Sequence, residues 1–219
     1  MSRTGNVPTM RSPLHPFDLN EKAKQMDASC GVWANEVPLL GYISLRGSPI
    51  EASFVGGASK SLGLTLPTEP CTLSEAAGVK VMWLSPDEWM IVCPRDRLSG
   101  LLNDLDKALT GVRSQVADNS GGYTQVLLQG AKAADALSHC TVYDLRSLEV
   151  GRVVGTTFGK SAIYLHRHGQ DRHGQGYCLL FRRSFADYIW RYLVRAAGPY
   201  GFGVARLDKE TGPEKGAAP

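Results

Sequence analysis

The arrangement of apolar and polar residues over 41–54 predicts a β-strand followed by the start of a helix. The run "GYISLRG" predicts the strand. The segment "SPIEASF" behind it predicts the start of the helix, with Ser48 as N-cap, Pro49 at the first helical position and Glu51 completing a capping box. A strand followed at once by a helix is therefore expected here.

The same order returns in the second half of the chain. The run "TQVLLQG" predicts a strand and "AKAADALSHC" a helix, and Leu45 and Gly47 lie 83 positions before Leu128 and Gly130. Self-similarity at a fixed offset is typical of chains built from repeated units. We therefore expect two halves of similar structure.

A β-hairpin follows in each half. In "VKVMWLSPDEWMIVCP" two apolar runs flank the segment 85–88, where Pro and Asp favour a tight turn. The counterpart "SAIYLHRHGQDRHGQGYCLLFRR" predicts a second hairpin with a longer loop at about 168–176.

An amphipathic helix follows each hairpin. Asp96 and Ser184 precede the two apolar stripes and are good N-cap residues. The stripes have helical spacing and comprise Leu98, Leu101, Leu102, Leu105 and Leu109 in the first helix, and Phe185, Tyr188, Ile189, Tyr192 and Leu193 in the second.

These elements predict an α+β fold with internally duplicated strand-helix-hairpin-helix units. One helical layer covers one face of a sheet, so two similar α+β layers should pack together. The predicted parts are a proline-rich, extended and partly disordered N-terminal arm (1–38), a first half (39–112), a second half (113–206) and a flexible tail (207–219).

Composition restricts the class of protein. The chain has 219 residues of which 43% are apolar, enough for a full core. Its net charge of +3 comes from scattered Lys and Arg, which argues against nucleic-acid binding. The absence of a long apolar run predicts no membrane segment and no export, and the five cysteines form no C-x-x-C pair, as expected for reduced thiols in the cytoplasm.

The sequence offers several weak chemical candidates. His166, His168 and His173 straddle a hairpin tip, where contact with a loop or a partner is favoured over a metal site. Neighbouring residues in a turn point apart, so the pair Asp87-Glu88 is interpreted as turn chemistry. The pair His139-Cys140 has no evident orienting acid, so a nucleophile is not favoured. No catalytic residue and no metal ligand are assigned.

Two pairs of residues are candidates for binding. Asp118 and Ser120 precede a buried strand and could point into a cleft shared by the halves, as cofactor-binding residues, or could cap the start of that strand. Trp190 falls off the apolar stripe of its helix, so Trp190 with Arg191 is predicted to be exposed and to anchor a partner interface.

The ordered set "LRG", "WLSPDEWMIV", "ADNSGGYTQVLLQG", "VGRVVGTTFGKSAIYLHR" and "LLFRRSFADYIWRYL" resembles the gamma subunit family of heterotetrameric sarcosine oxidases over about residues 40–203. The most specific pieces are "WLSPDEWMIV" and "RRSFADYIW". That family is similar in fold to the two-lobed, folate-binding aminomethyltransferases, whose D-V-S motif resembles the segment of Val116, Asp118 and Ser120.

The resemblance implies a non-catalytic subunit that supports assembly of a complex with alpha, beta and delta subunits. Such a complex oxidises sarcosine to glycine and transfers the one-carbon unit to tetrahydrofolate. It also implies that FAD, FMN, NAD and tetrahydrofolate belong to the partner subunits and that this chain alone binds none of them.

Three alternatives stay open at this point. The chain could be the equivalent subunit of a related N-methyl amino acid dehydrogenase, which would share the fold and change the substrate. It could be a standalone folate-binding, transferase-like protein with Asp118 as the polar anchor of a cleft. It could also be a general binding module of another partner.

Overall fold

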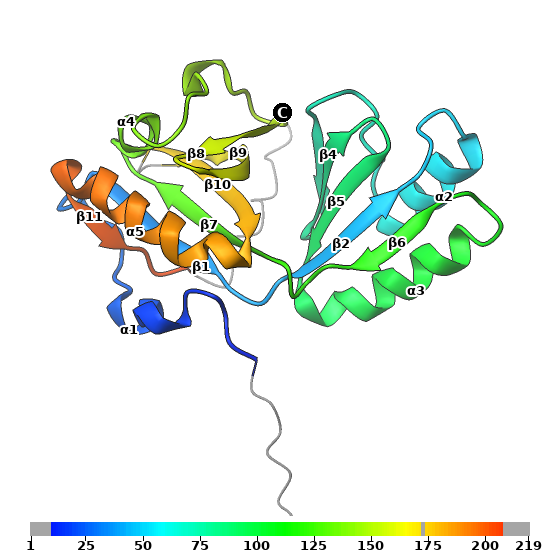
Figure 1. Cartoon of the computed structure of the whole chain (residues 1–219), viewed down its shortest axis with the longest axis horizontal. Helices are drawn as coiled ribbons and strands as arrows, with labels where there is room; N and C mark the ends of the chain where they lie inside the picture. The colour runs from blue at the N-terminus through cyan, green and yellow to red at the C-terminus, as the bar shows by residue number, and fades with distance from the viewer. Residues whose placement is uncertain (1–9, 172–173, 208–219) are drawn as a thin grey trace, which may run out of the picture.

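The computed structural model describes residues 10–171 and 174–207 of the chain. Two lobes lie side by side, and each holds one β-sheet whose outer face is covered by helices (Figure 1). The predicted α+β class is confirmed. Within the described residues, no helix is long and apolar enough to cross a bilayer.

The first lobe contains a five-stranded sheet in the order β3-β4-β5-β2-β6. Helices α2 and α3 lie against its outer face and close a core around Phe54, Trp89 and Leu105. In chain order the elements are β2 (Gly41–Arg46), α2 (Ala52–Leu62), β3 (Leu73–Ala76), β4 (Val79–Ser85), β5 (Glu88–Cys93), the short 3-10 helix η2 (Arg95–Arg97), α3 (Leu98–Ala108) and β6 (Gln115–Asp118).

The second lobe contains a six-stranded sheet in the order β11-β1-β7-β10-β9-β8. Helices α4 and α5 cover its outer face. Its elements are β1 (Val32–Val37), β7 (Tyr123–Gln129), α4 (Ala133–Ser138), η3 (Leu145–Ser147), β8 (Val153–Phe158), β9 (Ser161–Asp171), β10 (Gly174–Arg182), η4 (Arg183–Phe185), α5 (Ala186–Ala197), η5 (Gly198–Tyr200) and β11 (Phe202–Val204).

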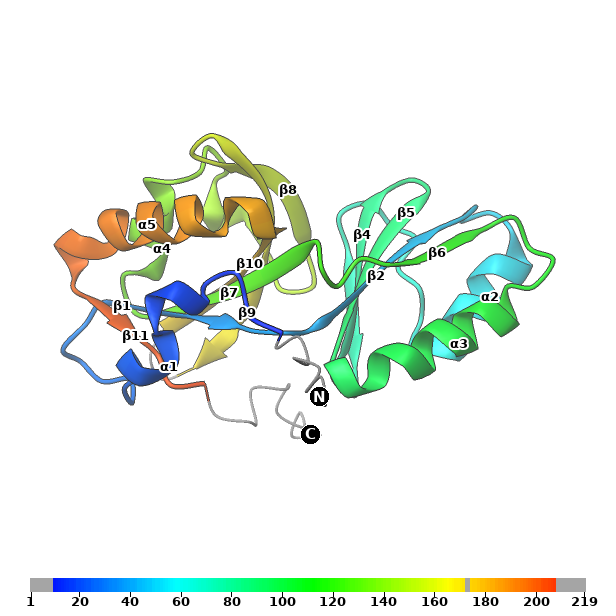
Figure 2. The same ribbon diagram turned by 60° about the horizontal axis from the view of Figure 1, so that its bottom comes forward.

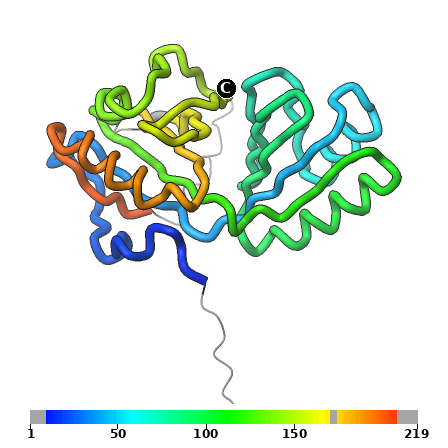
Figure 3. Tube along the Cα trace, viewed as in Figure 1, coloured from blue at the N-terminus to red at the C-terminus, as the bar shows by residue number. Residues whose placement is uncertain are grey.

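The lobes exchange one strand each. β1 precedes β2 in the chain but pairs antiparallel with β7 in the second lobe, and β6 precedes β7 but pairs antiparallel with β2 in the first. The two connections pass from lobe to lobe at the same junction, as Figures 2 and 3 show. The chain therefore builds one strand of the second lobe, then the first lobe, and then the rest of the second lobe.

The predicted boundary of the N-terminal arm at residue 38 is wrong, because β1 is a central strand of the second sheet. Val32, Trp33 and Ala34 are all buried, with both faces of the strand covered. Such a strand lacks the polar-apolar alternation by which strands are recognised in a sequence. Before it, η1 (His15–Phe17) and α1 (Leu19–Lys22) lie against the second lobe, whose core includes Leu14 and Leu19. Residues 1–9 lie outside the described part.

The predicted helix starts are also wrong in detail. α2 begins at Ala52 with Glu51 at the N-cap position and without a side-chain cap, whereas Ser48 opens a turn in which its carbonyl accepts the Glu51 N–H at 3.2 Å. The chain folds back tightly here, since a Cβ on Gly47 would clash with the Phe54 ring. Asp96 and Ser184 lie inside η2 and η4, so neither caps the helix that follows.

The hairpins confirm the predicted topology. Residues 86 and 87 form the turn between β4 and β5. In the second lobe the loop is shorter than predicted, because β9 extends to Asp171 and β10 begins at Gly174. The predicted tail from 207 onward lies, except for its first residue, outside the described part of the chain.

Candidate functional site between the lobes

The inner faces of the two sheets meet in an apolar contact. Tyr42, Met82, Met90 and Val92 of the first lobe pack against Val153 and Leu180 of the second. A backbone bridge fixes the neighbouring sheet edges, where the Val153 N–H donates to the Cys71 carbonyl at 2.9 Å and the Leu73 N–H donates to that of Gly151 at 2.9 Å. The lobes are thus joined by packing as well as by the exchanged strands.

A buried polar contact, which the sequence analysis did not identify, joins the two inner faces. Lys80 on β4 and His166 on β9 are 8% and 1% exposed, and Lys80 Nζ lies 3.3 Å from His166 Nε2. His166 Nδ1 lies 2.9 Å from the carbonyl of Arg167. Since a carbonyl only accepts, Nδ1 carries the proton and Nε2 accepts from the ammonium group of Lys80.

The surroundings of this contact keep His166 neutral. Burial, and then the charge of Lys80, keep the pKa of His166 well below its ordinary value of 6.5. On its other side Lys80 Nζ pairs with Glu75 Oε2 at 3.3 Å. The Lys80 charge is therefore compensated by Glu75, while a neutral His166 supplies a hydrogen-bond acceptor. The only sequence signal for this contact was a lysine inside the apolar run "VKVMWL".

Two buried cysteines, Cys178 beside this contact and Cys140 at the end of α4, have unreactive thiols. Cys178 is fully buried beside Gln125, whose Oε1 lies 3.5 Å from its sulfur, and burial raises the pKa of its thiol to about 11. Burial likewise raises the pKa of Cys140 to about 12. The neighbouring His139 turns to Tyr200, with 2.8 Å between Nε2 and the phenol oxygen. Cys140 and His139 thus do not form a nucleophile and base.

Asp118 and Ser120 fasten the crossover between β6 and β7 to β2. Asp118 Oδ1 accepts from the Ser120 N–H at 2.9 Å and from its hydroxyl at 2.5 Å, and Ser120 Oγ accepts the Tyr42 N–H at 3.0 Å. Burial acts to raise the pKa of Asp118, but the Ser120 hydrogen bonds outweigh it and lower that pKa. We describe these two residues as a structural clasp and assign no cofactor to them.

The prediction of an exposed Trp190 is wrong. Trp190 is only 3% exposed and packs in the core of the second lobe. Its ring centroid lies 6.2 Å from that of Phe17 and 5.7 Å from that of Phe202. Arg191 is exposed, pairs with Asp187 at 3.0 Å and lies over the Phe17 ring. Trp190 therefore anchors the protein's own N-terminal segment.

The structure describes two of the three histidines singled out in the second hairpin. His166 is buried between the lobes, His168 lines a pocket of about 290 Å³ together with Lys80, and His173 lies outside the described residues. Across residues 10–171 and 174–207, no cluster of three His, Cys, Asp or Glu side chains could hold a metal ion.

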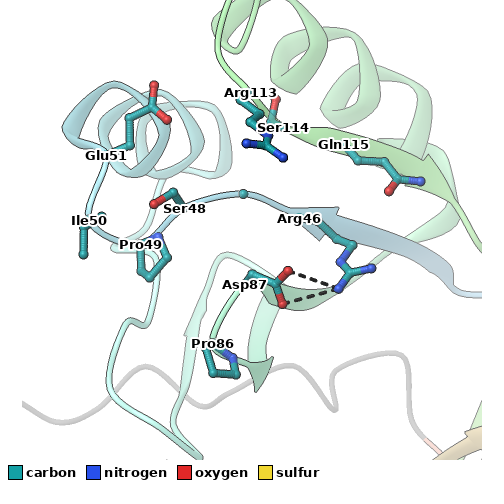
Figure 4. A pocket seen from close by; sticks show the side chains of 11 residues that line it. Arg46, Ser48, Pro49, Ile50, Glu51, Pro86, Asp87, Arg113, Ser114 and Gln115 are labelled. Carbon is teal, nitrogen blue, oxygen red and sulfur yellow. Dashed lines mark hydrogen bonds and ion pairs between the residues drawn. The ribbon is translucent and has the colours of Figure 1, made fainter.

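A further pocket of about 620 Å³ lies on the first lobe between the turn before α2, the β4-β5 turn and the start of β6 (Figure 4). Asp87 accepts from Arg46 Nη2 at 3.1 and 3.3 Å and from Ser85 Oγ at 3.0 Å, so it braces the turn, as predicted for the pair Asp87-Glu88. Arg113 reaches toward Ser48, and Ile50 at the rim is 94% exposed.

The fold belongs to the aminomethyltransferase-like class. The glycine cleavage system aminomethyltransferase T from Bartonella henselae superposes with a TM-score of 0.62 at 16% identity, over 85% of this chain and 57% of that one. At this identity the likeness establishes the fold alone. The lobes of this chain are joined by apolar packing and by the contact between Lys80 and His166.

The family follows from closer similarities. The model of the sarcosine oxidase gamma subunit family matches residues 46–198, and the chain belongs to that family. It is 30% identical to the sarcosine oxidase subunit gamma of Arthrobacter sp over 189 residues, which are 85% of this chain and 89% of the relative. A chain of the heterotetrameric sarcosine oxidase from Corynebacterium sp. U-96, in complex with pyrrole 2-carboxylate, superposes with a TM-score of 0.78 at 25% identity, over 91% of this chain and 99% of that one. The predicted family is confirmed.

Proposed function

We propose that the chain is the gamma subunit of a heterotetrameric sarcosine oxidase, in which it supports assembly and contributes no complete active site. The complex would contain alpha, beta and delta partner subunits and act in the cytoplasm. It would oxidise sarcosine to glycine and pass the one-carbon unit to tetrahydrofolate, with FAD, FMN, NAD and tetrahydrofolate held by the partners.

The observation that carries this proposal is the end-to-end match with a sarcosine oxidase chain, which leaves 1% of that chain uncovered. A chain of the same extent and fold fits the same place in an assembly. The interior agrees with this role, because the charged side chains at the junction of the lobes bond to other residues of this chain: Lys80 to Glu75 and His166, and Asp118 to Ser120.

The alternatives are less well supported. A subunit of an N-methyl amino acid dehydrogenase or a standalone folate-binding protein would share the fold, but the family match and the curated relative both belong to sarcosine oxidase. The hydrogen bonds of Asp118 to Ser120 also leave its Oδ1 engaged, which weakens its role as a folate anchor.

An omission experiment tests the proposal. The alpha, beta and delta genes of the same genome are expressed with and without this chain, and sarcosine-dependent oxygen consumption and flavin absorbance are measured on the purified material. We expect a yellow, active complex only when this chain is present. Full activity of the three partners without it, or folate binding by the chain alone, would overturn the proposal.

A further inference from the structure

A second cavity at the junction of the lobes has a lining of one charge. This junction pocket of about 360 Å³ lies where the N-terminal segment, the end of β5 and the crossover to β7 come together. Its charged side chains are Arg11, Arg95 and Arg183, and no Asp or Glu lines it. The three arginines come from separate parts of the chain.

Among the residues that the structure describes, the three guanidinium groups form no ion pair with a carboxylate. Every ion pair within 4 Å between the described residues involves other cations, such as Arg46, Lys80 and Arg152. The contacts of the pocket arginines are weak: Arg95 Nη2 lies 3.9 Å from the sulfur of Met10, and Arg183 Nη1 lies 3.4 Å from the Gly121 carbonyl. The charge of Arg95 does help to lower the pKa of Asp118, without an ion pair between the two side chains. The donors of the pocket arginines are therefore available to an external anion.

Exposed apolar side chains lie beside this charge. Met10 is 58% and Leu39 43% exposed, and both line the junction pocket. Leu39 also has a left-handed backbone with φ of 56°, a conformation that costs a non-glycine residue energy. Arginines next to exposed apolar groups are typical of the anchoring region of a protein interface.

The frame of the junction pocket is fixed. The Asn119 N–H donates to the Tyr42 carbonyl at 2.7 Å, and Ser120, which lines the pocket, accepts the Tyr42 N–H. The Arg183 N–H donates to the Gly122 carbonyl at 3.0 Å, which holds the start of η4 against the crossover. A partner would meet a preformed surface and pay little ordering cost.

We infer that the junction pocket docks an acidic segment of a partner subunit, one that places a carboxylate among Arg11, Arg95 and Arg183 and an apolar side chain on Met10 and Leu39. This inference rests on the proposed function for the existence of a partner. The charge of the lining sets the chemistry of the segment, and the exposed apolar rim favours a polypeptide over a small anion.

The test is charge reversal in the complete complex. The full chain, tagged, is co-expressed with alpha, beta and delta subunits as wild type, as Arg95→Glu/Arg183→Glu and as Lys60→Glu/Lys107→Glu. The last pair has the same change of charge on the exposed faces of α2 and α3. The dissociation constant for the partners is measured at about 50 and 300 mM salt, and melting temperatures of the free chains serve as a check of folding.

The expected result is a loss of affinity of about tenfold to a hundredfold for the arginine variant, with a weaker salt dependence than wild type and no comparable loss for the lysine variant. Should the arginine variant melt early, Arg95→Gln/Arg183→Gln is measured in its place. Affinity within twofold of wild type would overturn the inference. Stabilisation of the free wild type by inorganic phosphate, with partner capture unchanged in the variant, would also overturn it in favour of a small-anion site. Failure of the wild type to bind any partner would instead refute the proposed function.

Discussion

Replacement of Trp190 tests directly how the N-terminal segment packs on the second lobe. The side chain is 3% exposed and is held between Phe17 of the N-terminal segment and Phe202 of β11. Full burial of a Trp removes about 200 Å² from water, or about 5 kcal/mol at 25 cal/mol per Å² as an upper bound. Truncation of large aromatic core residues costs about 3–5 kcal/mol. We expect Trp190→Ala to lower the free energy of unfolding by that amount.

The assay is urea denaturation of the purified chain followed by circular dichroism. Val142→Ala, at a side chain 90% exposed, serves as the control and should change stability by less than about 0.5 kcal/mol. Phe17→Ala combined with Trp190→Ala should reveal a coupling of about 0.5–1.5 kcal/mol, because the two rings are in contact. A loss below about 1 kcal/mol for Trp190→Ala would refute the reasoning, since a well-buried Trp costs more than that.

Three other perturbations follow from the interior. The pKa of His166 is depressed in the folded chain, so below about pH 6.5 the unfolded chain binds a proton that the folded chain does not. The free energy of unfolding should therefore fall as the pH falls from about 7 to about 5, which urea midpoints can follow. His166→Gln, whose amide oxygen can still accept from Lys80, should flatten this dependence. Iodoacetamide at neutral pH should label the exposed Cys71 fastest and leave Cys178 unlabelled in the folded chain, as peptide mass spectrometry can check. Asp118→Ala should cost about 0.5–1.5 kcal/mol by removing the acceptor of the Ser120 clasp, measured as a shift of the thermal midpoint.

Each of these has a result that contradicts it. An equal slope of stability with pH in wild type and His166→Gln would mean that another group titrates. Labelling of Cys178 at the rate of Cys71 would mean that the space between the lobes opens in solution. A stability change within about 0.5 kcal/mol for Asp118→Ala would reduce the clasp to a surface contact.

The sequence predicted the order of elements because local signals determine it. Both hairpins and the helix after each have strong periods, and the Pro-Asp turn at 86–87 lies where the turn chemistry indicated. Helix α5 was placed correctly but its buried face was not. The predicted stripe counted large apolar residues, whereas the buried stripe includes Ala186 and Ala197 as well as Trp190. Alanine adds little to the hydrophobic periodicity of a helix, although its small side chain allows the helix to pack closely.

The remaining errors come from long-range pairing. β1 was assigned to an arm because its partners, β7 and β11, are about a hundred residues or more away, and nothing local reveals that pairing. The predictions of a free N-terminal arm and of an exposed Trp190 fail for the same reason, because Phe17 of that arm packs on Trp190. The contact of Lys80 with His166 joins two lobes across 86 positions, so residue types alone could not reveal it.

The central claim, that this chain is one subunit of a four-subunit sarcosine oxidase, is tested most directly by native mass spectrometry. The complex is purified through a tag on this chain after co-expression with the alpha, beta and delta genes. We predict one species that contains one copy of each subunit, of which this chain contributes 23.7 kDa, and that oxidises sarcosine. A tagged chain recovered only as a free monomer or a homo-oligomer would contradict the account.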